Sequence, residues 1–203
     1  MTRRITCGYI YPLKRKDQVF EQFKVWQAEV ENLGGRKLKT LRTDNGGEFT
    51  SKSFQAYLTS RGVRHELTIP KTPQQNGAAE RLNRTLVEAT RAMLLDANLS
   101  QRFWAEAVST AAYLKNRSPT STLDEMTPYQ ALFGMKPHVK HLRLFGCKTY
   151  AHVPGDERKK LDSKTRKCIF LGYGNVQKGY RVYDEKAKWI FYSRDVKFDE
   201  MKN

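Results

Sequence analysis

An acidic residue stands directly before a turn-forming stretch in the segment LRTDNGGEF, residues 41–49. Asp44 is followed there by Asn45, Gly46 and Gly47. Asp, Asn and Gly are common turn residues, because their side chains or backbone freedom satisfy a tight bend without further chemistry. A carboxylate at the end of a strand can also act as a ligand through its oxygen atoms. Asp44 is therefore either a turn residue or a ligand, and a ligand requires a second carboxylate nearby.

Glu80 is the candidate for that second carboxylate, and 35 residues separate it from Asp44. It falls in the first turn of a predicted long helix, where the positive end of the helix dipole favours an ionised acid. The preceding loop, residues 70–77, contains two prolines and forces a sharp path that could return Glu80 toward Asp44. The alternative interpretation of Glu80 is a solvated acid at a helix start.

The charge of the chain indicates a polyanionic partner. Its 203 residues include 37 Lys and Arg against 21 Asp and Glu, which gives a net charge of +16. Residues 136–181 alone carry 12 basic and 3 acidic side chains. Such a surplus is typical of nucleic-acid binding, and the alternative is a merely soluble basic surface. No apolar run approaches the roughly 20 residues of a membrane-spanning helix, and the N-terminus lacks a secretory apolar region, so we expect an intracellular protein without membrane contact.

The cysteines favour neither a disulfide framework nor a zinc site. Cys7, Cys147 and Cys168 are odd in number and lack short spacings, which is typical of a reducing compartment. A second cluster combines one of them with histidines: His138, His141, Cys147 and His152. Because no paired Cys-x-x-Cys accompanies this cluster, we do not expect zinc there.

Alternating strand and helix patterns over residues 5–97 predict an α/β layer structure. The expected strands are residues 5–13, 37–43 and 63–69, with His65 as a packed core residue. The expected helices are residues 17–33, with Asp17 as N-cap, 51–62, a long helix after residue 77, and 100–117. On the long helix, the charged residues Glu80, Arg84, Glu88 and Arg91 share one face.

The chain changes character near residue 118. A linker-like stretch with a short helix at 129–133 precedes aromatic-rich, closely spaced strands, and the segment at 184–186 has the composition of a hairpin turn. This pattern predicts a small antiparallel β-barrel or sandwich. The expected domains are residues 1–117, a linker with a short helix at 118–140, and a small β-barrel-like domain at 141–203.

TDNGGEF, followed after 35 residues by Glu80 within TPQQNGAAERLNRT, resembles the integrase core of copia-type long-terminal-repeat retrotransposons. The later segments TPYQALFG, FGCKTYAHVP, KCIFLGY and SRDVKFDE are similar to those that follow the core in that family. The resemblance spans nearly the whole chain. It implies a ribonuclease-H-like α/β core, followed by the small all-β domain, in a polyprotein that integrates DNA.

The resemblance also implies a catalytic site of three acids, Asp, Asp and Glu, that hold two Mg²⁺ or Mn²⁺ ions. Asp44 corresponds to the second acid and Glu80 to the third, and both would be catalytic and metal-binding. Two such ions stabilise the attacking and leaving oxygens of a phosphoryl transfer. The partners implied are DNA ends and target DNA, self-association in the intact protein, and action in the nucleus after a cytoplasmic stage. The residues expected along the DNA are Lys71, Gln75, Asn76, Arg81, Arg84 and Arg91, although Arg84 and Arg91 also fit a solvated helix face.

The sequence departs from that family pattern at its start. The first acid belongs on a strand two strands upstream of residues 5–13, and no Asp precedes Asp17. We therefore expect a core that lacks its first two strands, one of its three acids and a zinc-binding N-terminal domain, and that joins DNA poorly or not at all. The alternative is a non-enzymatic nucleic-acid-binding remnant, and a nuclease acting on RNA hybrids is a third hypothesis.

Overall fold

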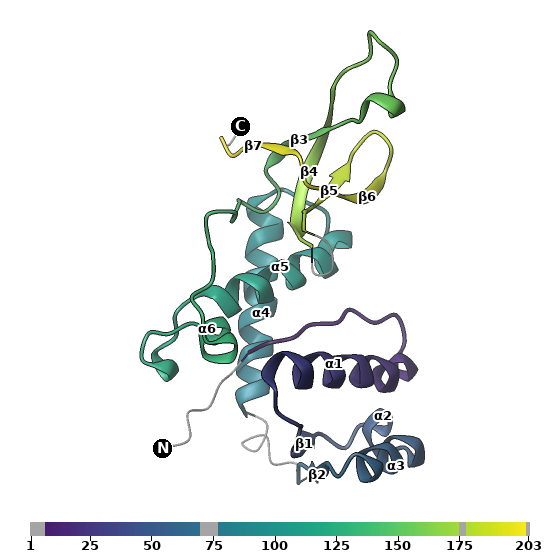
Figure 1. Ribbon diagram of the computed structural model, residues 1–203, viewed down its shortest axis with the longest axis vertical. Coiled ribbons are helices and arrows are strands. Elements are labelled where there is room, and N and C mark those ends of the chain that lie inside the picture. Colours follow the sequence, from purple (N-terminus) through teal and green to yellow (C-terminus); the bar gives the residue numbers. More distant parts are fainter. Residues whose placement is uncertain (1–6, 70–76, 175–177, 202–203) are drawn as a thin grey trace.

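The computed structural model of the protein describes residues 7–69, 77–174 and 178–201. An α/β part lies at one end of the long axis of the molecule and a β-sheet at the other end (Figure 1). The long helix α4, Gly77–Asp96, runs between these two parts. The N-terminal end of this helix lies near the level of the α/β part (Figure 1), and Glu80 belongs to its first turn.

Two parallel strands form the sheet of the α/β part. β1 and β2 pair with Thr40 opposite Arg64 and Thr43 opposite Leu67. Parallel strands need a crossover connection, and two helices supply it here. The elements of this part, in chain order, are the 3-10 turn η1 Lys16–Gln18, α1 Val19–Gly34, β1 Thr40–Thr43, α2 Gly47–Thr50, α3 Lys52–Ser60 and β2 Arg64–Leu67.

A small aromatic core holds α1 and α3 together. Phe23 of α1 packs with Phe54 and Leu58 of α3, and Val63 completes the buried cluster. The rings of Phe23 and Phe54 lie 5.1 Å apart. Gly35 ends α1 in the left-handed conformation, with φ of 60°, which glycine adopts without steric cost. The predicted strands at 37–43 and 63–69 are confirmed with shorter bounds, and the predicted helix at 17–33 is confirmed with a later start and an end at Gly34.

The expected strand at residues 5–13 is wrong for its described residues, 7–13, which form no strand. The backbone N–H and C=O groups of a strand need hydrogen-bond partners on a neighbouring strand. At Gly8, a side chain supplies these partners instead. Gly8 N donates to Oδ1 of Asn116 at 2.9 Å, and Gly8 O accepts from Nδ2 of Asn116 at 2.8 Å. One amide on α5 therefore satisfies the backbone of this segment at Gly8.

Asp17 is not the N-cap of the first helix. It lies inside η1 and pairs with the exposed guanidinium of Arg15. Gln18 occupies the N-cap position of α1 and makes no capping bond with its side chain. The sequence predicts that the Asp17 carboxylate caps the helix backbone, but this carboxylate pairs with the Arg15 guanidinium instead.

A helical layer follows α4. α4 and α5 pack along Leu86, Ala111 and Ala112. Leu82, Ala89 and Met93 pack against this cluster, so α4 has an apolar stripe that faces the helical layer. The short helix α6 has Thr127 as N-cap, whose hydroxyl accepts from Gln130 N at 3.0 Å. The elements of this layer after α4 are η3 Gln101–Phe103, α5 Trp104–Arg117, η4 Ser121–Leu123 and α6 Pro128–Phe133.

The C-terminal part is a five-stranded antiparallel sheet with strand order β6-β5-β4-β3-β7. β6 ends at Ser193 and β7 begins at Val196, although they lie at opposite edges of this order. A connection this short requires the sheet to curl until its edges approach, as in a barrel. The strands are β3 Lys148–His152, β4 Thr165–Tyr173, β5 Tyr180–Asp184, β6 Trp189–Ser193 and β7 Val196–Asp199, with the 3-10 turn η5 Gly155–Glu157 after β3.

The predicted turn at 184–186 joins β5 to β6 as a hairpin. Asp184 Oδ1 accepts from Lys186 N at 2.8 Å and from Ala187 N at 2.9 Å. Its Oδ2 pairs with Nε of Arg166 at 3.3 Å. Asp184 is buried, and these partners satisfy the carboxylate that the fold removes from water.

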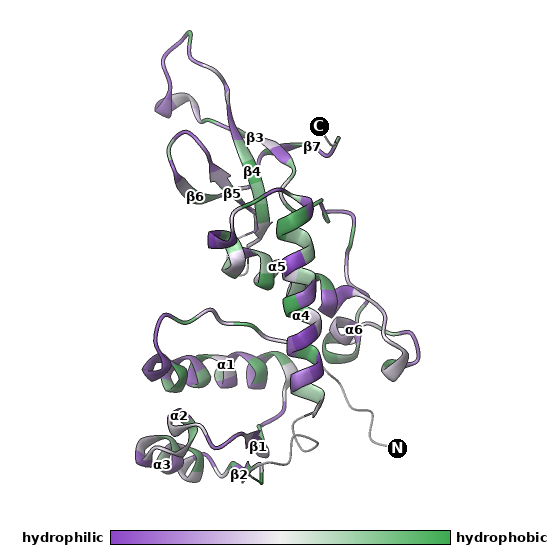
Figure 2. Cartoon of the chain, turned by 180° about the vertical axis from the view of Figure 1, so that it is seen from behind, coloured by the Kyte–Doolittle hydropathy of each residue, from purple (hydrophilic) through white to green (hydrophobic). Residues whose placement is uncertain are grey.

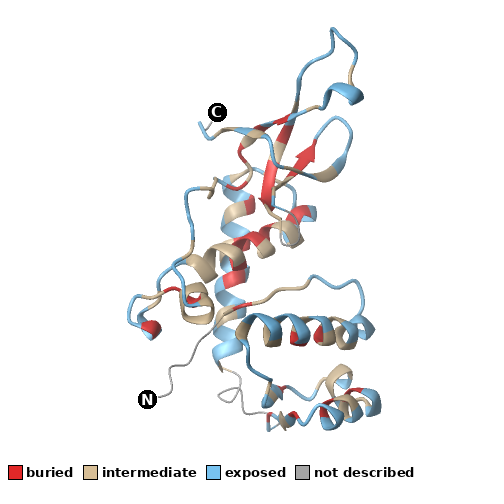
Figure 3. Ribbon diagram, in the orientation of Figure 1, coloured by how far each residue is buried: buried red, intermediate tan, exposed pale blue. Residues whose placement is uncertain are grey.

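One hydrophobic cluster joins the helices to the barrel. It combines Leu94, Phe103 and Ala107 of the helical layer with Phe145, Leu171 and Tyr183 of the C-terminal part. Figure 3 shows buried residues on α4, α5 and β4, and Figure 2 shows β4 as mainly hydrophobic. The division into 1–117, 118–140 and 141–203 remains a prediction, and the two outer segments share one core here.

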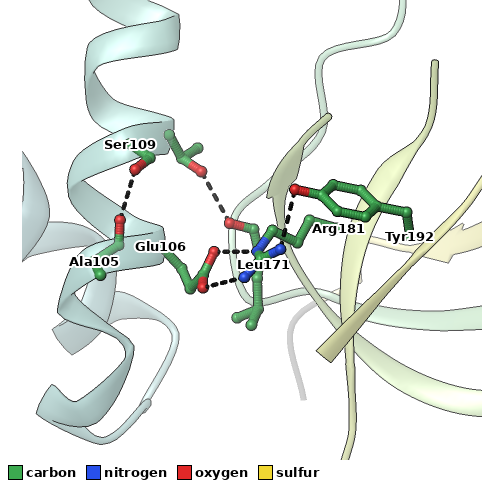
Figure 4. Close-up of polar contacts among 7 residues, drawn as sticks. Ala105, Glu106, Ser109, Leu171, Arg181 and Tyr192 are labelled. Carbon is green, nitrogen blue, oxygen red and sulfur yellow. Dashed lines mark hydrogen bonds and ion pairs between the residues drawn. The ribbon is translucent and has the colours of Figure 1, made fainter. Parts of the chain in front are cut away.

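Two glycines allow this close packing. A Cβ at Gly172 would lie 2.4 Å from Oγ1 of Thr110, and a Cβ at Gly146 would lie 2.2 Å from Cβ of Ala97. Thr110 Oγ1 instead donates to Leu171 O at 2.9 Å (Figure 4).

In the described residues, no helix has the length and apolarity needed to cross a membrane.

Candidate metal and nucleic-acid site

Asp44 lies immediately after β1, at the carboxyl end of a parallel strand. It is exposed, and its Oδ1 accepts from Gly46 N at 3.0 Å, which is the local turn bond that its sequence predicts. Asn45 links the same turn to the segment that follows β2, because its Nδ2 donates to Thr68 O at 2.8 Å. Ligand sites in open α/β sheets lie at this edge. Asp44 is thus an exposed turn residue.

A chain of hydrogen bonds supports Asp44 from inside the sheet. Thr43 Oγ1 donates to Asp44 O at 2.8 Å and lies 2.9 Å from Nε2 of His65. Nδ1 of His65 lies 2.7 Å from Nε2 of Gln55. Because the Thr43 proton is used on Asp44 O and the Gln55 amide is a donor, His65 must carry its proton on Nε2. The network therefore requires a neutral imidazole.

His65 is a packed residue, as its place in the alternating strand pattern predicts. Its ring lies 6.1 Å from that of Phe54, and both of its nitrogens are engaged by neighbours. Burial lowers the pKa of His65 below its ordinary value of 6.5, which is consistent with the neutral form in the network. His65 positions the Asp44 turn and offers no nitrogen to a metal.

Glu80 lies in the first turn of α4 and is exposed. Leu86 on the same helix is buried, so the apolar stripe turns inward and the charged face turns to solvent. The four residues of that face are all exposed: Glu80, Arg84, Glu88 and Arg91. Arg81 is exposed as well, and Lys71, Gln75 and Asn76 lie outside the described residues.

The carboxylates of Asp44 and Glu80 are suitable donors for a divalent cation, but they do not form a complete set of ligands. Both present exposed carboxylates, the hard oxygen donors that Mg²⁺ prefers. Among the residues that the structure describes, no three His, Cys, Asp or Glu side chains gather where they could hold a metal ion. The two acids come from different elements, because Asp44 follows β1 directly and Glu80 lies in the first turn of α4.

The histidine and cysteine cluster of the C-terminal half has other contacts. Nε2 of His141 lies 2.7 Å from the hydroxyl of Tyr113. Cys147 is buried, and burial raises the pKa of its thiol to about 11. His138 stacks on His141 with ring centroids 6.1 Å apart, and His152 is exposed on β3.

Several residues around Asp44 carry no signal in the sequence alone. Thr43, Gln55 and His65 come from three different elements, and only the parallel register brings them together. The alternation of the second strand shows that His65 points inward, but it does not identify the hydroxyl it meets. The support of the Asp44 turn is therefore a product of the tertiary fold.

Two family models match the chain. Residues 4–73 match the one described as the integrase core domain, and residues 147–203 match the one described as the retroviral polymerase SH3-like domain. The first match contains Asp44, and the second covers the five-stranded sheet. The second match also agrees with the predicted β-barrel-like domain in its fold.

The curated relatives are much longer proteins. The Retrovirus-related Pol polyprotein from transposon TNT 1-94 of Nicotiana tabacum is 52% identical over 192 residues, which are 95% of this chain and 14% of that protein. The polyproteins from transposons RE1 and RE2 of Arabidopsis thaliana are each 38% identical over 192 residues, 95% of this chain and 13% of each protein. The chain thus spans a small part of these relatives.

Two solved structures are also similar. A simian T-cell lymphotropic virus intasome, in complex with the PP2A regulatory subunit B56 gamma, matches with a TM-score of 0.48 and 21% identity, covering 94% of this chain and 66% of that chain. The HTLV-2 integrase catalytic core domain in complex with magnesium matches with a TM-score of 0.41 and 26% identity, covering 55% of this chain and 68% of that chain. These scores are low, so the assignment rests on the family models and the topology.

The matched core segment and the α/β layers define an integrase core of the ribonuclease-H-like fold. The chain carries the integrase core domain and the retroviral SH3-like domain of a retrotransposon Pol polyprotein. At the level of the family, the integrase core domain supports DNA integration.

Proposed function

We propose that this chain is the part of a copia-type integrase that helps to join retrotransposon DNA ends to target DNA, with Asp44 and Glu80 as two of its metal ligands. The observation that carries the proposal is the position of Asp44, at the carboxyl end of β1 on a turn that a partly buried hydrogen-bond network supports. A carboxylate used only for a turn needs no such support from a second strand and a helix.

The residues of this chain would divide the work between binding a cation and binding DNA. Asp44 and Glu80 would hold Mg²⁺, which supplies electrostatic stabilisation to the oxygens of a phosphodiester. Arg84 and Arg91 are exposed on the face of α4 that carries Glu80, so they would neutralise DNA phosphates beside the acids. Arg81 and the loop residues Lys71, Gln75 and Asn76 would extend this contact toward the helix start.

The 203-residue chain supplies two of the three acids that the family resemblance implies, so we propose that by itself it binds Mg²⁺ weakly and does not join DNA. Self-association and action in the nucleus belong to the same proposal, because integration acts on chromosomal DNA through paired DNA ends.

The test measures cation binding and joining separately. Mn²⁺ binding to the purified chain is followed by electron paramagnetic resonance, and we expect weak binding that Asp44→Asn and Glu80→Gln abolish. Glu88→Gln is the matched control, since it removes an exposed acid from the same helix face. Equal Mn²⁺ binding by all variants would contradict the proposed site.

Joining is then measured with element-end DNA and Mg²⁺. The chain alone should give no product, and the chain extended by the residues that precede the matched segment in the tobacco relative should give product. Asp44→Asn in the extended protein should abolish it. Product from the extended protein carrying Asp44→Asn would remove Asp44 from the mechanism.

A second candidate function is nucleic-acid binding without catalysis, which the net charge of +16 favours. Duplex-DNA binding that survives Asp44→Asn and Glu80→Gln, combined with no joining by the extended protein, would select this alternative.

A further inference from the structure

A cavity lies far from the Asp44 turn, where α5, the segment before β3 and the β4 and β5 strand ends meet. Its volume is about 460 Å³, and its walls include the rings of Tyr113, His141, Tyr173 and Tyr180. Lys178 and Arg194 add two cations to the wall. A concave site of this volume is suited to a small molecule or to one unit of a polymer.

The aromatic wall is held rigidly. Tyr113 and Tyr173 stack with centroids 4.3 Å apart and planes 18° from parallel. His141 meets both rings edge-on, at 6.0 Å and 5.5 Å. The polar atoms of the rings are tied down: Tyr113 Oη lies 2.7 Å from His141 Nε2, Tyr173 Oη accepts from Arg143 N at 2.9 Å, and Tyr180 Oη donates to His141 O at 3.4 Å. Rings fixed in this way lose little entropy when a ligand binds.

The surroundings of the cavity are electropositive. Arg117 lies over the ring of Tyr113 at 3.3 Å, and His138 stacks on His141. Burial lowers the pKa of His141, and the nearby Arg117, His138 and Arg143 lower it further. The described residues that line the cavity include no Asp or Glu.

The two wall cations remain available to a ligand. Lys178 is exposed. Arg194 pairs through Nε with Asp195 at 3.6 Å, with both side chains mostly exposed, which is a weak surface pair. The guanidinium can therefore bind an anion at the mouth of the cavity.

We propose that this cavity binds a single nucleotide, with its phosphate on Lys178 and Arg194 and its base against the tyrosine and histidine rings. Aromatic rings stack on any base, and Lys and Arg form charge-assisted hydrogen bonds with phosphate. The two cations select the phosphate, and the aromatic rings select the base. The proposal rests on the proposed function in one respect, the expectation that a strand of nucleic acid supplies the nucleotide.

The test titrates the full 203-residue chain with adenosine 5′-monophosphate, adenosine and inorganic phosphate in separate calorimetric experiments. Adenosine 5′-monophosphate should bind at least about tenfold more tightly than adenosine or inorganic phosphate, because it contacts both the aromatic rings and the two cations. The ring resonances of His141 should shift on binding. A single-stranded pentanucleotide that binds more tightly than the mononucleotide would identify a strand as the source, and weaker binding would identify the free nucleotide.

The variant Lys178→Gln/Arg194→Gln should weaken binding of adenosine 5′-monophosphate by roughly 10-fold to 100-fold. The control Lys159→Gln/Lys164→Gln removes the same charge from the exposed β3–β4 connection and should change the affinity by less than about twofold. Equal losses in both variants, or phosphate binding as tightly as the nucleotide, would overturn the proposal.

The outcome is separable from that of the proposed function. If the Lys178→Gln/Arg194→Gln variant binds the nucleotide normally while substitutions at Arg84 and Arg91 weaken duplex binding, the nucleotide site alone is wrong. If nucleotide binding fails as predicted in that variant while Mn²⁺ binding is unaffected by Asp44→Asn, the metal proposal alone is wrong.

Discussion

Arg181 donates two hydrogen bonds to the carboxylate of Glu106, from Nε at 2.5 Å and from Nη2 at 2.9 Å, across 75 residues of sequence. Nη1 of the same guanidinium donates to the hydroxyl of Tyr192 at 3.0 Å (Figure 4). The hydrogen bond to Glu106 is the main cause that raises the pKa of Arg181 above its ordinary value. A bidentate pair of this kind fixes both distance and orientation, so it holds β5 at a set position on α5.

Glu106→Ala should lower the free energy of unfolding by roughly 1.5–3 kcal/mol, because it leaves a partly buried guanidinium without its partner. Urea unfolding followed by circular dichroism measures the change. Glu21→Ala is the control, since Glu21 pairs with Lys24 on an exposed helix surface, and its effect should stay within about 1 kcal/mol. Equal effects of the two variants would show that the Glu106 pair is no stronger than a surface pair.

Gly172→Ala should also destabilise the joint between helix and barrel. Gly172 has φ of +149°, and an added Cβ would meet Oγ1 of Thr110 at 2.4 Å. The expected decrease in the free energy of unfolding is about 1–3 kcal/mol, as for overpacking in a well-packed core.

Gly155→Ala is the matched control for Gly172→Ala, because no atom lies within 4 Å of its added Cβ. Its effect should stay within about 0.5 kcal/mol in the same urea unfolding experiment. If Gly172→Ala were as harmless as this control, the close approach of β4 to α5 would be wrong.

The stability of the protein should fall as the pH is lowered from about 7 to about 5.5. His65 and His141 both have a pKa below the ordinary 6.5 in the folded protein, chiefly because of burial. The unfolded chain therefore binds more protons in this interval, and the free energy of unfolding decreases toward the folded pKa.

Unfolding curves at about pH 7, 6 and 5.5 measure this dependence. The variant His65→Gln/His141→Gln should lose most of it, since Gln does not titrate. An unchanged slope in the variant would place the pH dependence in other groups.

Arg84→Gln/Arg91→Gln should weaken binding to duplex DNA of any sequence. It should also reduce the salt slope of log K by about 1 for each DNA phosphate that the variant no longer neutralises. Fluorescence anisotropy at several salt concentrations measures both effects. Arg36→Gln/Lys37→Gln removes the same charge from the exposed connection between α1 and β1 and should leave the slope nearly unchanged. Identical slopes for the two variants would show that α4 does not bind DNA.

The sequence predicts local features well, because helix and strand periods report which face of each element is buried. The end of α1 at Gly35, the inward face of α4 and the position of Asp44 after β1 all follow from such patterns. The resemblance supplied the family, which the matched domains confirm. The roles of Asp44 and Glu80 remain predictions.

Partners distant in sequence were not predicted. A β-branched and aromatic segment predicts a strand at 5–13, but a strand also needs a neighbour, and Asn116 binds the Gly8 backbone instead. The partners of Glu106 and His65 likewise come from other elements, and periodicity carries no information about them. Asp17 failed as an N-cap because Arg15 competes for its carboxylate.

The cluster of Leu94, Phe103 and Ala107 with Phe145, Leu171 and Tyr183 sets a rule for anyone who builds chimaeras of this protein. A splice at residue 147, where the SH3-like match begins, would divide this cluster between two parents and pair mismatched surfaces. A splice ahead of α4 would carry both halves of the cluster from a single parent. Exchange of C-terminal segments among relatives is therefore expected to yield well-folded hybrids only when α4 and α5 travel with the barrel.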